Sequence, residues 1–461
     1  MQSSRLLALS ATLAVSACAT PPARPVPPDL PVEWRHVVAL PASTSANTQW
    51  WEPFKGSGLE PLLTLAIHDN PGLGAIAERV AAARLQRQHA TDTLLPRLDA
   101  RTYNAIDPDA SAAYVMGGFE AVWEIGLFGR LEAVRDLSQA ELDSALADAE
   151  AAQTALLGNI ANDYVVLAGA IENARLSTLE IALQRQREAA LLRRVDLGLS
   201  STSELRMATL ARLAAEQSLR EAKEQGDAAS IRLAVLCGST RPQAGWQTAK
   251  LPNGQLTVPS QLPAELLRTR PDIHKAEAAV KHAAAEAGLA DAARYPAISL
   301  GGLVLASRNV NSNRVAKEYE IATAGPSLEI PLFDWGFKQA QATAGHHLLA
   351  AATLDYRAVV LVAYQEAENA LGQLQLATSR EDTAAEALQV ARQVTTATRR
   401  REELGLASPL DSLSAQASEL TDEKIWNEAR RERALAYVAV YHVLAGASPT
   451  GAESTGSSAS R

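Results

Sequence analysis

Catalytic motifs, disulfide partners and long apolar runs are all scarce in this chain of 461 residues. Its two cysteines are Cys18 and Cys237, and its eight histidines form no H-E-x-x-H pair. The chain has no Walker loop, no G-x-G-x-x-G motif after a predicted strand and no G-x-S-x-G elbow. We therefore expect no enzyme and no metal site, and we expect Cys237 to be a small buried apolar residue.

Positive charge is also in deficit. One of the 43 basic side chains and none of the 52 acidic ones lies in residues 1–17, so the remaining chain has a formal charge of −10. A nucleic-acid partner is not expected, because it needs a basic face. No run after residue 17 is judged apolar and long enough for a transmembrane helix, so any membrane segment is expected to consist of strands in a closed barrel.

The N-terminus has the pattern of a secretory signal, in which one arginine precedes an apolar run too short to span a membrane. Val15-Ser16-Ala17-Cys18 resembles the bacterial lipobox, which predicts that residues 1–17 are removed and that Cys18 carries a covalent lipid. Ala19 follows, which by resemblance to sorted lipoproteins favours the outer membrane. The alternative is an ordinary signal peptide with an incidental cysteine. Residues 18–49 are rich in proline and predict an extended linker.

An internal repeat organises the rest of the chain. WEIGLFGR (123–130) and LGLSSTSEL (197–205) return as LEIPLFDWG (328–336) and LGLASPLDSL (404–413). Phe128 and Phe333 are 205 residues apart, and Gly198 and Gly405 are 207 apart. A repeat of this length predicts a duplicated half-molecule. We expect the first repeat at 50–262, the second at 263–446, and a low-complexity tail at 447–461.

Two stretches without proline, Gly129 to Leu197 and Phe337 to Leu404, are filled with good helix formers. A helix of that length would extend about 100 Å, far beyond the width of a globular core. Such helices are typical of coiled coils, stalks and conduits. Returning helices are expected at 201–236 and 409–445, and shorter ones at 59–67, 72–95 and 272–294.

Four strands are predicted, at about 97–107, 112–124, 297–306 and 319–332. Between Ala113 and Trp123 apolar and small residues alternate with a second set, which is typical of a two-sided strand of a membrane barrel. Trp123 and Phe128 lie where an aromatic girdle is expected. Pro326 and Pro331 predict that the fourth strand is an edge or contains a bulge.

Four strands cannot close a barrel by themselves. Two copies of the chain would supply eight, which side chains fill, whereas three copies would supply twelve and leave a bore. The predicted fold class is therefore mainly α with a membrane β-barrel, in which three copies give twelve strands and the long helices also close on each other. The trimer is the smallest assembly with a lumen, although the sequence alone does not prove it.

The lipobox, the Trp50-Trp51 segment, the EIGLFGR corner with its PLFDWG counterpart and the twin G-L-x-S turns together resemble the outer membrane factor family, the TolC-like and especially OprM- or NodT-like lipoproteins. The resemblance covers roughly residues 48–446. It implies a homotrimer, with a trimeric twelve-stranded β-barrel in the outer membrane joined to a periplasmic α-helical barrel. The implied partners are a periplasmic adaptor protein and an inner-membrane RND-type pump. It also implies passive export of drugs or other small molecules, with no cofactor besides the lipid on Cys18.

The two turns between long helices are the expected periplasmic tips. Gly198 and Gly405 suit a left-handed helix end, and the serines that follow suit helix caps. The bland interpretation is two well-formed helix hairpins. The resemblance adds that the adaptor docks here, on Leu197, Gly198, Leu199, Ser200, Leu404, Gly405, Leu406, Ala407 and Ser408.

The resemblance also places the periplasmic gate just after the second tip, at Leu410 and Asp411. In a trimer each becomes a ring of three, and such rings can gate by dewetting or select by charge. Glu204 holds the equivalent place after the first tip. For Asp411 the alternative is an exposed acid that stabilises a helix N-terminus.

Two other functions were weighed against the efflux duct. One is an outer membrane duct of a protein-secretion system. The other is a structural periplasmic lipoprotein, a coiled-coil spacer without a lumen, which would need neither alternating strands nor girdle aromatics.

Overall fold

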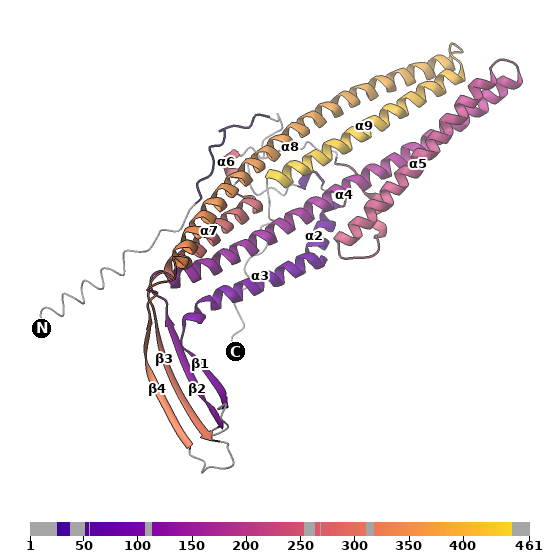
Figure 1. The fold of residues 1–461 in the computed structure, drawn as a ribbon. Helices are drawn as coiled ribbons and strands as arrows, with labels where there is room; N and C mark the ends of the chain where they lie inside the picture. The colour runs from indigo at the N-terminus through magenta and orange to yellow at the C-terminus, as the bar shows by residue number, and fades with distance from the viewer. Residues whose placement is uncertain are drawn as a thin grey trace. The chain divides into compact units, whose positions relative to one another are not determined.

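The computed structural model describes residues 25–36, 51–54, 56–106, 113–252, 263–267, 269–309 and 318–444 (Figure 1). The signal, Cys18, most of the proline-rich linker and the tail lie outside this part. The chain divides into two compact units. Unit 1 consists of residues 1–28, 78–147 and 272–359, and unit 2 of residues 29–77, 148–271 and 360–461.

One antiparallel sheet lies in unit 1. It consists of β1 (Arg97–Ile106), β2 (Ala113–Ile125), β3 (Ala297–Asn309) and β4 (Glu318–Glu329), in that order across the sheet (Figure 1). Each repeat supplies one hairpin, and β2 and β3 join the two hairpins over twelve paired positions, from Tyr114 opposite Asn309 to Ile125 opposite Ile298. β1 and β4 are therefore the edges of the sheet.

The ends of two strands differ from the prediction. β3 extends to Asn309 instead of ending near residue 306, because its polar last residues pair with β2. β4 ends at Glu329, which lies opposite the first residue of β3, so nothing in the described sheet pairs with residues 330–332. Pro326 remains in the ladder opposite Leu300 on this edge strand, as its missing N–H predicts.

The helices begin and end close to the prolines and glycines that the sequence analysis used as boundaries. α4 (Arg130–Asp196) and α8 (Phe337–Glu403) have 67 residues each, and they continue into α5 (Thr202–Leu236) and α9 (Pro409–Leu444). The predicted helix 72–95 is instead α3 (Pro71–His89) followed by the 3-10 turn η2 (Ala90–Leu94). The remaining helical elements are η1 (Glu52–Phe54), α2 (Leu59–Asp69), η3 (Ala244–Thr248), α6 (Pro263–Leu267) and α7 (Pro271–Ala292).

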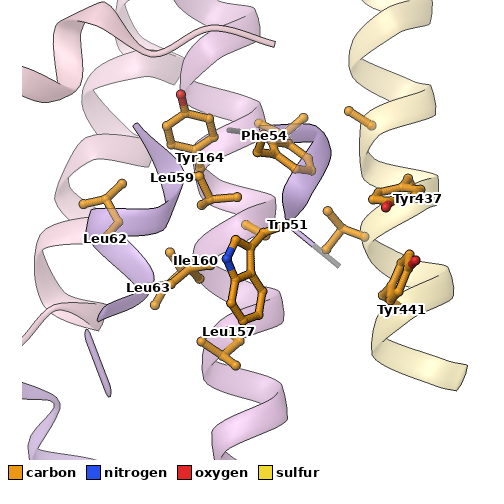
Figure 2. Packing of buried hydrophobic residues seen from close by; sticks show 14 of the residues in the cluster. Trp51, Phe54, Leu59, Leu62, Leu63, Leu157, Ile160, Tyr164, Tyr437 and Tyr441 are labelled. Carbon is orange, nitrogen blue, oxygen red and sulfur yellow. The ribbon is translucent and has the colours of Figure 1, made fainter. Parts of the chain in front are cut away.

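A hydrophobic core forms in unit 2 around Trp51 and Phe54 (Figure 2). Phe54, Leu59 and Tyr437 are at most 1% exposed. The backbone N–H of Lys250 donates to the Tyr164 hydroxyl at 3.1 Å, and this hydroxyl donates to the Ser57 carbonyl. Cys237 is 3% exposed within this core, as predicted for a small apolar residue.

The expectation that no helical run after residue 17 is apolar enough to span a membrane is wrong. Among the described residues, α4 and α8 each contain an 18-residue window that passes a test of length and composition. In α4 the window is 61% buried, because its apolar residues supply the core of unit 2. In α8 the window is only 17% buried. Alanine, leucine and valine make both windows apolar, so composition alone does not separate them from membrane helices.

The N-terminal segment is held on α8 within unit 2. The Trp34 ring stacks on Tyr364, with 5.7 Å between ring centroids. The backbone N–H of Arg35 donates to the Glu368 carboxylate at 2.8 Å, and Nδ1 of His36 lies 3.0 Å from the same carboxylate. Glu368 is 8% exposed. A nearly buried carboxylate therefore fixes residues 34–36.

Candidate functional site: a two-faced sheet and two helical tips

One face of the sheet is apolar and exposed. Side chains at alternate positions of paired strands share a face, and the register places these apolar residues together: Leu98, Phe119, Trp123, Leu300, Val304 and Leu328. Their exposed fractions run from 37% for Trp123 to 69% for Leu98. Water does not suit a continuous apolar face of this kind, whereas lipid does.

The opposite face of the sheet is charged on β1 and the adjoining part of β2, whereas β3 and β4 place Leu303, Leu305 and Ile321 on it. The guanidinium Nε of Arg97 lies 2.8 Å from Asp99 Oδ2, and that of Arg101 lies 3.0 Å from Glu120 Oε2. Glu124 ends this row and pairs with Arg130 at 3.0 Å. The alternation predicted for residues 113–123 is therefore confirmed as a two-sided sheet. The ion pairs were not predicted, although the alternating charges of β1 carried that signal.

Each half turns from its second strand into its long helix through a left-handed corner. Phe128 and Gly129 have φ of 53° and 82°, and Trp335 and Gly336 have φ of 59° and 80°. Phe128 stacks on Tyr295, with ring centroids 4.9 Å apart. Trp335 is 91% exposed and contacts only Phe333 among the ring pairs described in its vicinity. The girdle prediction named Trp123 and Phe128 and missed this second aromatic corner, which the FDWGF sequence signals.

The two tips have the same backbone. At the first, the N–H of Leu199 donates to the Arg194 carbonyl at 2.7 Å, and Gly198 has φ of 72°. At the second, the N–H of Leu406 donates to the Arg401 carbonyl at 2.7 Å, and Gly405 has φ of 71°. This is the glycine-terminated helix end that the sequence predicted.

Both tips, which lie in unit 2, expose leucines. The exposed fractions are 71% for Leu197, 63% for Leu199, 68% for Leu404 and 66% for Leu406. The two glycines are exposed as well, whereas Ser200, Ala407 and Ser408 are half-buried. Apolar side chains at the end of a helix hairpin contribute nothing to its core, so the tips are candidate contact surfaces.

The helix caps distinguish the second tip from the first. Ser201 Oγ accepts from the N–H of Glu204 at 3.2 Å. Ser408 Oγ accepts likewise from the N–H of Asp411 at 3.2 Å, and Asp411 Oδ2 accepts in return from the N–H and the hydroxyl of Ser408, both at 2.9 Å. The Asp411 carboxylate therefore closes a capping box. Leu410 beside it is half-buried.

Electrostatics reinforce this cap. The Ser408 N–H and hydroxyl hold the pKa of Asp411 below its usual range, and Arg401 and Arg194 lower it further. Arg194 Nε also donates to Ser200 Oγ at 2.9 Å, and Arg401 Nη2 donates to the Leu406 carbonyl at 3.4 Å. The sequence already placed Arg401, with Arg399 and Arg400, on the approach to the predicted gate, whereas Arg194 was not predicted. Arg194 lies four residues before Gly198, as Arg401 lies four before Gly405, and this equal place in the repeat is the signal that could have found it.

The chain combines a two-faced antiparallel sheet with pairs of very long helices. The fold is similar to that of the Neisseria gonorrhoeae MtrE outer membrane channel, solved in an open state, with a TM-score of 0.76 and 22% identity, covering 92% of this chain and 97% of that one. That likeness concerns the fold.

The family follows from the sequence. The model of the outer membrane efflux proteins matches residues 62–239 and 262–446, so the chain belongs to this family. It is 28% identical over 401 residues to the pyoverdine export outer membrane protein OpmQ of Pseudomonas aeruginosa, covering 81% of this chain and 82% of that one. It is 28% identical over 393 residues to the cation efflux system protein CusC of Escherichia coli K12, covering 80% and 83%. The protein is thus an outer membrane efflux channel, as the resemblance implied.

Proposed function

We propose that three copies of this chain form a passive duct, with a twelve-stranded barrel in the outer membrane and a helical conduit in the periplasm. The two-faced sheet with two free edges carries this proposal. Its apolar face suits lipid and its charged face suits a water-filled bore. Within the described residues the four strands leave both edges of the sheet unpaired, and twelve strands give a barrel wide enough for a lumen.

The partners in this proposal are a periplasmic adaptor and an inner-membrane RND-type pump that supplies the energy. The exposed leucines of both tips support adaptor docking there. The cargo is a class of small molecules, since the relatives are named for exporting pyoverdine and cations. A duct for protein secretion is less favoured, and a spacer without strands does not fit the sheet. Cys18, outside the described residues, is proposed to carry the lipid.

The gate is proposed at Leu410, Asp411 and Glu204. A carboxylate held by its own helix cap keeps a fixed place and stays ionised at neutral pH, which suits a charged ring. The two interpretations of Asp411 are therefore compatible: the same carboxylate caps α9 and faces the neighbouring arginines.

Single-channel recording from purified protein in planar bilayers tests the duct. Wild-type protein should conduct, and Asp411→Ala should change the conductance or its block by divalent cations. Asp196→Ala is the matched control, because it removes an exposed acid next to the first tip that lies outside the proposed gate. Complete absence of conductance in both wild type and variants would reject the duct. In cells, a deletion strain tested against a panel of toxic compounds identifies the cargo.

The lipid needs its own test. Metabolic palmitate labelling should mark the wild-type protein and leave Cys18→Ser unlabelled. Label that persists in Cys18→Ser would contradict the assignment, and Cys237→Ala is the control that removes the other cysteine.

A further inference from the structure

The last residues of β2 pair differently from the rest of that strand. β1 begins at Arg97, opposite Val122, so it does not reach residues 123–125 of β2. β2 nevertheless continues to Ile125, because these residues pair with β3 on the other side. β4 reaches only Glu329, opposite the first residue of β3. Beyond it, Ile330 is 49% exposed and Leu332 is 89% exposed. In the first half, pairing with β3 extends β2 by three residues. In the second half, β4 has no such neighbouring strand within the described sheet and is not extended.

The backbone shows which residues of the two halves correspond. Arg97 and Ala297 begin β1 and β3, 200 residues apart, and their partners Val122 and Glu329 are 207 apart. The left-handed corners and the starts of α4 and α8 are also 207 apart. The similar sequences EIGLF and EIPLF are 205 residues apart. Aligning the halves by these sequences is therefore two residues off the alignment given by the backbone. The structural equivalent of Ile125 is Leu332.

We propose that β4 continues to Leu332 by pairing with β1 of a second copy of this chain, in the register that β2 and β3 already use. Leu332 then lies opposite Leu98 of the next copy, Ile330 opposite Ala100 and Glu329 opposite Arg101. We call this contact the seam. It rests on the proposed barrel and specifies how its three joints are made.

Charge and apolar patterning favour this register. It places the exposed carboxylate of Glu329 opposite a guanidinium on the polar face, and opposite charges across strands are stabilising. The register given by the similar letters would place Glu329 opposite Asp99, a pair of like charges. On the other face, Leu332 and Leu98, 89% and 69% exposed, continue the apolar surface across the joint.

A glycine repeats at the same place. A Cβ on Gly118 would lie 1.9 Å from the Val304 carbonyl oxygen, so β3 approaches β2 where only glycine fits. Gly325 is the structural equivalent in β4, and a Cβ there meets nothing within 4 Å. The seam gives Gly325 the role that Gly118 has, because β1 of the next copy then runs alongside it.

The corner agrees with the seam. Phe128 stacks on Tyr295, the residue two before β3. By the same equivalence, Trp335 covers Leu95 of the next copy, the residue two before β1. These side chains are 91% and 54% exposed in the single chain. The seam thus covers two large apolar surfaces at once.

Cysteine pairs in a full-length Cys237→Ala background test the register. The seam predicts disulfides between copies for Ile330→Cys with Ala100→Cys and for Leu332→Cys with Leu98→Cys, because directly opposite residues lie within disulfide reach. The matched controls, Leu328→Cys with Ala100→Cys and Ile330→Cys with Leu98→Cys, use the register shifted by two residues. After mild oxidation in outer membranes, non-reducing gels should show dimers and trimers for the first two pairs and monomers for the controls.

The outcomes separate the seam from the barrel. The Cys237→Ala parent, fixed with an amine cross-linker, reports whether trimers form at all. Trimers whose disulfides appear in the shifted pairs, or in none of the four, would overturn the seam and leave the barrel standing. A parent that remains monomeric would overturn both. Each single-cysteine variant should stay monomeric on non-reducing gels, since a head-to-tail joint places no position opposite itself.

Discussion

The two corners between sheet and long helix have the same backbone in different surroundings. At the first corner, Phe128 is 39% exposed and stacked, and a Cβ on Gly126 would meet Leu94 and Leu131 at 3.1 Å. At the second corner, Trp335 is 91% exposed. The first corner is packed by the other half of its own chain. Duplication gives both halves the same joint, and in the proposed seam another copy of the chain completes the second one.

The tips show the opposite relation. Their hydrogen bonds agree within the helix end, and they differ in the cap, where Asp411 accepts from Ser408. Backbone geometry that glycine and serine determine locally is the same in both halves. Contacts that depend on another part of the fold differ between the halves.

The largest expected effect is at the tips. Gly405→Glu and Gly198→Glu should each abolish resistance to exported compounds while trimers persist, because the substitution puts a charge among exposed leucines. The left-handed φ costs a side chain only about 1–2 kcal/mol, too little to unfold a long helix. Susceptibility assays and native gels measure the two effects. Gly405→Ala, with the same strain and no charge, should retain partial resistance. Loss of trimers would mean that the tips serve folding instead.

The corners give the next effect. Phe128→Ala should weaken the fold of each chain by about 0.5–1.5 kcal/mol, the size of an aromatic pair. Trp335→Ala should cost the single chain less, because Trp335 is 91% exposed and meets only the ring of Phe333 there. It should make the trimer dissociate on dilution, since the proposed seam places Leu95 of another copy against it. Unfolding in denaturant and gels over a dilution series distinguish them. Equal behaviour of the two variants in both assays would contradict the difference between the corners.

A smaller effect is expected for the proposed charge pair. Glu329→Arg and Arg101→Glu should each weaken trimers, and the double variant should recover about 0.2–1 kcal/mol, as for other cross-strand pairs. Thermal dissociation of trimers in mild detergent measures the recovery. Glu329→Arg combined with Arg97→Glu is the control, since Arg97 is not opposite residue 329 in the seam. Recovery in the control alone would favour another register.

The smallest effect concerns the cap that distinguishes the tips. The folded-state pKa of Asp411 is lowered, so its stabilisation is fully present above the unfolded pKa and is lost as pH falls through the folded pKa. Asp411→Asn should therefore melt at a lower temperature than wild type at pH 7, and the gap should close at strongly acidic pH. Thermal melts followed by circular dichroism measure this. A difference in melting temperature that does not change with pH would show that the charge of Asp411 does not contribute to the stability of the cap.

The sequence predicted the long helices almost to the residue, because glycine and proline mark their ends locally. It missed the ends of β3 and β4, since a strand ends where its partner ends, and the partner is distant in sequence or in another copy. The letters EIGLF and EIPLF suggested an offset of 205, whereas hydrogen bonding places the halves 207 apart. The tip glycines were predictable, but the bond from Ser408 to Asp411 needed coordinates to distinguish a cap from a free acid.

The hydrogen bonds from residues 35 and 36 to Glu368 fix this segment on α8. If Cys18 carries a lipid, they therefore limit the distance between α8 and the bilayer. Trp34 lies sixteen positions after Cys18, and a fully extended stretch of that length reaches at most about 58 Å. A lipid on Cys18 would make this stretch a tether of that maximum length, attached at the middle of α8. Shortening the tether by deletion would draw this part of the helix toward the membrane. Lengthening it would leave the distance between helix and membrane to be determined by the barrel alone.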